Sequence, residues 1–152
     1  MTRNKLILFA ALGSAAMLLG AWGSQYLGYA PCKMCLWQRW PHEAAFVVGI
    51  AALVVPWAIL PLIGALSAAI TGAIGVYHSG VEKRWWPGPD TCTSGDISDL
   101  STDELMDQIL GAPLVRCDEV SWAFMGLSMA TWNALLSFVL LAIWLTAWRK
   151  SN

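Results

Sequence analysis

Charged side chains are scarce in this chain of 152 residues, where they make up 12% of the sequence, against about 25% in an average soluble domain. Three long segments, 6–32, 44–81 and 120–148, contain no charged residue. An apolar stretch of roughly 18 residues or more without charge is typical of a membrane span. The composition therefore predicts an integral membrane protein. With a net charge of −1 and no basic patch, nothing in it indicates nucleic-acid binding.

Four spans are predicted within a single domain over 1–152. Their approximate limits are 6–29, 41–59, 62–80 and 122–148. The charge-free stretch 44–81 is too long for one span, which needs about 20 residues, and Pro56 and Pro61 offer a break because proline lacks the N–H that a helix needs. The first apolar stretch could instead be a cleaved signal peptide, which also follows a basic start. Its length fits a full span better.

Small residues at every fourth position let a second helix approach closely in lipid, and two of the predicted spans contain such a stripe. The stripes are Ala16, Gly20, Ser24 and Gly28 in the first span, and Gly64, Ala68 and Gly72 in the third. We expect both stripes to pack against neighbouring helices.

The segments about 30–40 and 81–121 are predicted to be loops outside the membrane. The longer loop region holds nine of the ten acidic residues, between Glu82 and Glu119. Within it, Ser101-Thr102-Asp103-Glu104 matches a capping box, in which the Ser and Glu side chains satisfy the first free N–H groups of a helix. This motif predicts a short amphipathic helix over about 102–110. The expected fold is an all-α membrane protein, a four-transmembrane-helix bundle with a long loop that carries this short helix.

Four spans place both termini on the same side of the membrane. Basic residues lie near both ends, at Arg3, Lys5, Arg149 and Lys150, and the positive-inside tendency assigns them to the cytoplasm. All four cysteines then lie on the opposite side, and disulfides persist in an oxidising compartment such as the periplasm. We therefore expect a multi-pass protein of the bacterial inner membrane whose long loop is periplasmic.

The four cysteines differ in spacing. Cys32 and Cys35 form a C-x-x-C motif, whereas Cys92 and Cys117 are separated by 24 residues in the acidic loop. Three uses are open: disulfides that only join loops, a zinc site, or redox exchange. A C-x-x-C is half of a typical zinc knuckle, but the chain lacks the second short pair, so we predict no metal site. Structural disulfides stay open as an alternative in an oxidising compartment.

The position of Cys35 favours redox exchange. A thiolate is the species that attacks a disulfide, and the free N–H groups at a helix N-terminus favour a negative charge. Cys35 lies just before the second predicted span, and Arg39 would follow one turn later on the same face. Arg39 could instead reach lipid headgroups, but the adjacent C-x-x-C favours a functional role. Arg39, His78 and, more weakly, Gln38 could donate hydrogen bonds to a lipid-soluble acceptor such as a quinone.

Together these motifs resemble one known family. The run Pro31-Cys32-Lys33-Met34-Cys35-Leu36-Trp37-Gln38-Arg39 is similar to the P-C-x-x-C-x-x-[QE]-R signature of the disulfide bond formation protein B (DsbB) family. The similarity extends to Tyr77-His78, to Trp86-Pro87-Gly88-Pro89 ahead of Cys92, and to Cys117 followed by Trp122 and Met125-Gly126-Leu127-Ser128. It covers essentially the whole chain. Lys33-Met34 departs from the more apolar pairs of the family.

The resemblance implies a quinone-dependent protein-disulfide oxidoreductase. Such an enzyme reoxidises a periplasmic thioredoxin-fold dithiol oxidase (DsbA-like) and passes the electrons to membrane quinone, ubiquinone or menaquinone. The partner would attack a Cys92–Cys117 disulfide through Cys92, and electrons would then pass to Cys32 and Cys35. The implied catalytic residues are Cys32, Cys35, Cys92 and Cys117, and the implied cofactor-binding residues are Arg39, His78 and Gln38.

Two other functions fit the same cysteines. A membrane thiol oxidoreductase of the vitamin K epoxide reductase kind also uses a four-helix bundle. That family usually carries its redox C-x-x-C near the last helix, whereas here the motif comes early. A non-enzymatic tetraspan protein with structural disulfides would need neither a protein partner nor a quinone, and its cysteines would resist a periplasmic dithiol.

Overall fold

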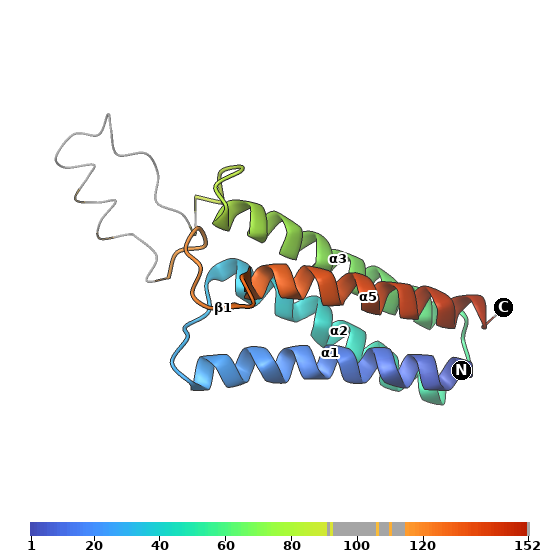
Figure 1. The fold of residues 1–152 in the computed structure, drawn as a ribbon. Helices are drawn as coiled ribbons and strands as arrows, with labels where there is room; N and C mark the ends of the chain where they lie inside the picture. The colour runs from blue at the N-terminus through green and yellow to red at the C-terminus, as the bar shows by residue number, and fades with distance from the viewer. Residues whose placement is uncertain (91, 93–105, 107–109, 111–114, 152) are drawn as a thin grey trace.

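The computed structural model describes residues 1–90, 92, 106, 110 and 115–151 of the chain. Within this part of the chain four long helices lie side by side (Figure 1). They are α1 (Arg3–Tyr26), α2 (Lys33–Val54), α3 (Ile59–Glu82) and α5 (Met129–Arg149). Each helix packs against the next in this order, and α5 also packs against α1. The two termini lie at one end of the bundle (Figure 1). Most of the short helix predicted over 102–110 lies outside the described residues.

Three of these helices, α1, α3 and α5, are long and apolar enough to cross a membrane. The helix α2 differs in composition, because its first half carries Lys33, Arg39 and Glu43 and only its second half is uniformly apolar. The described chain is thus a helical membrane protein with three candidate spans and a fourth helix. That α2 also crosses the membrane stays a prediction.

The helix α2 begins earlier than the second predicted span. Its N-cap is Cys32, whose sulfur accepts a hydrogen bond from the backbone N–H of Cys35. The helix therefore starts at Lys33 rather than near 41, and Pro41 lies inside it. The helix ends at Val54 rather than near 59, because Pro56 disfavours a helical residue before it.

The helix α5 begins later than the final predicted span, which was placed at 122–148. A two-stranded antiparallel hairpin, β1 (Ala123–Phe124) and β2 (Leu127–Ser128), occupies the intervening residues. Met125 and Gly126 form its turn with φ of 51° and 78°, and two successive positive φ angles give the turn that matches the twist of paired strands. Ser128 then caps α5 by accepting a hydrogen bond from the backbone N–H of Thr131.

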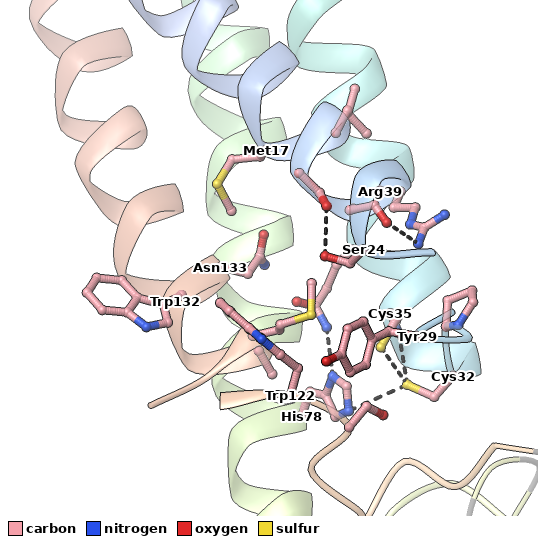
Figure 2. Close-up of a pocket in the computed structure, with 18 of the residues that line it drawn as sticks. Met17, Ser24, Tyr29, Cys32, Cys35, Arg39, His78, Trp122, Trp132 and Asn133 are labelled. Carbon is pink, nitrogen blue, oxygen red and sulfur yellow. Dashed lines mark hydrogen bonds between the residues drawn. The ribbon is translucent and has the colours of Figure 1, made fainter. Parts of the chain in front are cut away.

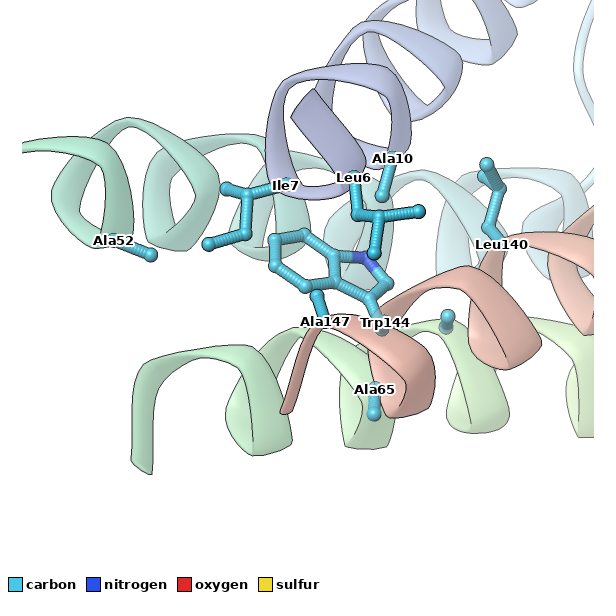
Figure 3. Close-up of a cluster of buried hydrophobic side chains, with 9 residues drawn as sticks. Leu6, Ile7, Ala10, Ala52, Ala65, Leu140, Trp144 and Ala147 are labelled. Carbon is cyan, nitrogen blue, oxygen red and sulfur yellow. The ribbon is translucent and has the colours of Figure 1, made fainter. Parts of the chain in front are cut away.

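The apolar core lies near the terminal end of the bundle and surrounds Trp144 of α5, which has no exposed surface (Figure 3). The other buried members of this core are Leu6, Ile7, Ala10, Ala52, Ala65, Ala68, Leu140 and Ala147. Gly64 of α3 makes room for the indole, because a Cβ built there would lie 2.7 Å from two of its ring atoms. A larger residue at this position would force α3 and α5 apart.

The two stripes of small residues have different surroundings. The stripe on α3 is buried, and Gly64 and Gly72 face side chains of α5, as predicted. The stripe on α1 was expected to pack in the same way, and this was wrong. Gly20 has no heavy atom within 4 Å of a built Cβ, and Ala16 is exposed. Both residues instead line a cavity between the helices.

Candidate functional site

The cysteines of the C-x-x-C motif lie together at the start of α2. Their sulfur atoms are 2.8 Å apart and both cysteines are free. Cys32 is 3% exposed, whereas Cys35 is only partly buried. The hydrogen bond from the Cys32 thiol lowers the pKa of Cys35, and the same bond together with burial raises the pKa of Cys32. Cys35 is therefore the thiol of this pair that ionises first.

The other two cysteines, Cys92 and Cys117, form a disulfide, with their Cα atoms 5.4 Å apart. Both are fully buried, and the backbone N–H of Cys117 donates to the carbonyl of Cys92 at 2.8 Å. This disulfide packs in one cluster with Cys32, and Cys35 lies against the same cluster. The fold thus brings all four cysteine side chains to one end of the bundle.

His78 of α3 lies between the two cysteine pairs. Its Nε2 is 3.6 Å from the Cys32 sulfur, and the backbone of Cys117 also hydrogen-bonds this ring. The Nδ1 atom is 2.8 Å from the amide nitrogen of Gln38, which also donates to the carbonyl of Met34. Since an amide nitrogen can only donate, Nδ1 accepts and Nε2 carries the proton. Gln38 therefore fixes the ring with its N–H directed away from Gln38, toward the Cys32 side.

Arg39 follows Cys35 by one turn of α2. Its terminal nitrogens donate to the Gln25 side chain at 2.9 Å and to the Ala21 carbonyl at 3.3 Å, both on α1. Its Nε is buried and has no hydrogen-bond partner among the described residues. A buried donor without a partner costs about 1–3 kcal/mol. Arg39 therefore has a free donor in position for a ligand.

A cavity of about 280 Å³ connects these groups. Figure 2 shows Cys32, Cys35, Arg39 and His78 on one side of it, with Met17, Trp132 and Asn133 among the residues on the other. Its walls come from α1, α2, α3 and α5 and are mainly apolar. Ligand sites typically combine such walls with a few polar groups that fix orientation. A flat, apolar molecule with carbonyl oxygens, such as a quinone, fits this donor set.

Sequence reasoning missed two polar groups of this region. Glu82, the last residue of α3, has a side chain that is only 7% exposed; it lies 3.9 Å from His78 Nε2 and accepts a hydrogen bond from Ser128. Its spacing of four residues from His78 was a usable signal, but the residue was counted with the acidic loop. His42 is hydrogen-bonded to Asn133 at 2.9 Å inside the bundle. The two residues lie on helices far apart in the sequence, so no local pattern predicts this contact.

The disulfide bond formation protein DsbB family model matches residues 3–147. The chain belongs to this family. Curated relatives named disulfide bond formation protein B include one from Azoarcus sp. (strain BH72), 30% identical over 97% of this chain and 96% of the relative. One from Pasteurella multocida is 30% identical over 82% and 75%, and disulfide bond formation protein B 2 of Pseudomonas aeruginosa is 31% identical over 76% and 73%. No solved structure matches the chain.

Membership of the DsbB family confirms the resemblance found in the motifs. The protein is a membrane disulfide bond formation protein, and its family implies disulfide oxidoreductase activity. The free C-x-x-C pair and the buried Cys92–Cys117 disulfide are the groups that this chemistry needs.

Proposed function

We propose that the protein is a quinone-linked thiol oxidase. It takes two electrons from a periplasmic thioredoxin-fold dithiol oxidase (DsbA-like) and passes them to ubiquinone or menaquinone in the membrane. The observation that carries this proposal is a free dithiol, Cys32 and Cys35, on the wall of an apolar cavity that also contains Arg39. Such a cavity between membrane helices suits an acceptor that arrives through the lipid, and a dithiol needs an acceptor of two electrons.

The state of the cysteines supports an order for the electron transfer. Cys92–Cys117, the outer pair, is a disulfide, whereas Cys32 and Cys35, the inner pair, are free thiols. This combination is expected once electrons have passed from the outer pair to the inner pair. The partner's first thiolate attacks Cys92, breaks the Cys92–Cys117 bond and frees Cys117. The partner's second thiolate then breaks the partner–Cys92 bond, so the partner leaves as a disulfide and both Cys92 and Cys117 are reduced. Exchange with a Cys32–Cys35 disulfide then re-forms Cys92–Cys117 and leaves the inner pair reduced. Each exchange breaks one S–S bond and makes another through a mixed disulfide.

The remaining polar residues of the site position the Cys32–Cys35 pair and bind its electron acceptor. Cys35 is the thiolate, because the hydrogen bond from Cys32 lowers its pKa and the charge of Arg39 lowers it further. Arg39 binds the acceptor's carbonyl oxygen through its free Nε. His78 holds Cys32 through its Nε2, and Gln38 fixes the ring of His78. Gln38 was expected to bind the cofactor directly, but with its amide nitrogen bonded to Met34 and His78 we assign it a positioning role. A bound quinone supplies a sink for two electrons and two protons.

The proposed location is the bacterial inner membrane, with both termini in the cytoplasm and all four cysteines on the periplasmic side. Three apolar helices support membrane insertion. The basic residues near both termini support this orientation through the positive-inside tendency. The cysteines lie at the opposite end of the bundle, where an oxidising compartment would maintain the disulfide.

The direct test is quinone reduction by the purified protein in detergent. A reduced thioredoxin-fold dithiol protein and a short-chain ubiquinone are added, and quinone absorbance and the donor's free thiols are followed together. We expect one disulfide to form in the donor for each quinone consumed. If quinone is not consumed while the donor stays reduced, the proposal is wrong. If all four cysteines also resist alkylation after treatment with the dithiol protein, the non-enzymatic alternative is favoured.

A further inference from the structure

Glu82 is a buried carboxyl group that the electron transfer described above does not use. Its side chain is 7% exposed and lies at the C-terminal end of α3, against the start of α5. One carboxylate oxygen accepts a hydrogen bond from Ser128, the N-cap of α5. The other is 3.9 Å from His78 Nε2, which in turn is 3.6 Å from the Cys32 sulfur. A carboxylate is costly to bury unless charge or hydrogen bonds compensate it.

Glu82 shares its cavity with the thiol pair. Glu82, Cys32 and Cys35 all line the cavity, and the charge of Glu82 acts on Cys35, where it raises the pKa of the thiol. The other titratable or charged groups around this cavity are His78 on α3, Arg39 and His42 on α2, Tyr29 after α1 and Glu119 before β1. Lys83 adjoins Glu82 along the chain. Two negative charges in one buried site repel each other, so ionisation of one group favours protonation of the other.

We propose that Glu82 is the proton carrier of the Cys32–Cys35 pair, taking up one proton when the pair is reduced and releasing it when the disulfide re-forms. Reduction breaks the S–S bond and adds two electrons and two protons, giving a Cys32 thiol, a Cys35 thiolate and a neutral Glu82 carboxylic acid. In the reverse direction both electrons and both protons leave to the quinone, which becomes quinol. The inference rests on the proposed function for its acceptor, but the proton uptake belongs to the thiol pair alone.

The proton count can be measured without quinone. Purified protein is equilibrated with dithiothreitol buffers of graded potential at several pH values around neutrality, and free thiols are then trapped by alkylation. Trypsin cleaves after Lys33 and Arg39, so Cys35 is recovered on the peptide 34–39 and is measured apart from the other cysteines. For the wild-type protein we expect two protons per two electrons. For Glu82→Gln we expect one, so that the pH dependence of the midpoint potential is halved.

Two further variants separate proton uptake from folding. Glu82→Asp keeps an ionisable group and should retain the full pH dependence. Glu43→Gln removes a carboxylate from the exposed face of α2 and should also retain it. A persistent Cys92–Cys117 disulfide in each variant reports an intact fold. An unchanged pH dependence in Glu82→Gln would overturn the proposal.

Infrared difference spectra provide a second readout of the same group. Reduction of the wild-type pair should produce the carbonyl band of a protonated carboxylic acid, and Glu82→Gln should lack this band. Its presence in Glu82→Gln would assign the proton to another group and overturn the proposal. With quinone present, Glu82→Gln should turn over about 100-fold more slowly, as is usual for a lost proton-transfer group. Undiminished turnover of Glu82→Gln would show that this proton does not pass to the quinone. If the wild-type protein reduces no quinone, the proposed function is wrong, but the measured proton count of the thiol pair still holds.

Discussion

The two cysteine pairs lie in one cluster but are held by different means. Cys32 and Cys35 are placed by a single helix, because Cys32 is the N-cap of α2 and Cys35 lies in its first turn. Cys92 and Cys117 are separated along the chain and meet through a disulfide and one backbone hydrogen bond. The inner pair thus has a fixed position facing the cavity, whereas the outer pair depends on its own bond. This difference suits one pair for an acceptor in the membrane and the other for exchange with a protein.

The largest expected effect is the loss of quinone reduction when a cysteine is replaced. The electron donor that still supports activity distinguishes the two cysteine pairs. Cys35→Ser should lower quinone reduction by about a thousandfold or more with any donor, as expected for loss of an essential nucleophile. Cys92→Ser should cause a similar loss with the thioredoxin-fold donor but retain activity with dithiothreitol, which can reduce the inner pair directly. Quinone absorbance measures both. Equal loss with both donors in Cys92→Ser would show that the pairs do not act in sequence.

A second prediction concerns the two thiols of the inner pair. The pKa of Cys35 is lowered and that of Cys32 is raised, so Cys35 holds more thiolate at neutral pH. Because the thiolate is the species that reacts, we expect Cys35 to be alkylated faster than Cys32 at pH 7. The preference should diminish as pH rises and the Cys32 thiol also ionises. Mass spectrometry of tryptic peptides measures both rates, and equal rates at pH 7 would contradict the assignment of Cys35.

Arg39→Ala should weaken quinone binding at the inner pair. A hydrogen bond from a charged group contributes about 1.5–3 kcal/mol, so the half-saturating quinone concentration should rise about tenfold to a hundredfold. Arg149→Ala, at the far end of α5, is the matched control and should leave it unchanged. The measurement is turnover over a range of quinone concentrations. If Arg39→Ala behaves like the control, the guanidinium has no role in binding the acceptor.

The smallest effect is expected for Gln38→Leu. This change removes the donor to His78 Nδ1 and leaves that buried nitrogen without its partner, which should cost about 1–3 kcal/mol of stability. Turnover should fall only a few-fold, because Gln38 acts through His78. Thermal unfolding and turnover together measure the change. If the half-saturating quinone concentration rises as much as in Arg39→Ala, Gln38 binds the acceptor directly instead.

Local sequence patterns predicted most of the helices. They misplaced the starts of two helices, where a helix cap or a turn, and not the apolar run, sets the boundary. Charge-free runs identified α1, α3 and α5 because a membrane span needs a long apolar segment. The start of α2 was placed too late, because the prediction followed the apolar run, whereas the helix begins at its Cys32 cap. The start of α5 was placed too early, because the apolar segment before Met129 turns back on itself at Met125 and Gly126.

For the site, the sequence alone predicted which residues carry the chemistry. The C-x-x-C motif and Arg39 one turn away follow from helix periodicity, and the family follows from these motifs. Only the tertiary structure decided that His78 faces Cys32, that Gln38 orients His78, and that the buried Glu82 lies beside the same thiol pair. These contacts join α2 to α3. Side-chain contacts between separate helices depend on how the helices pack, and no spacing within one helix encodes that packing.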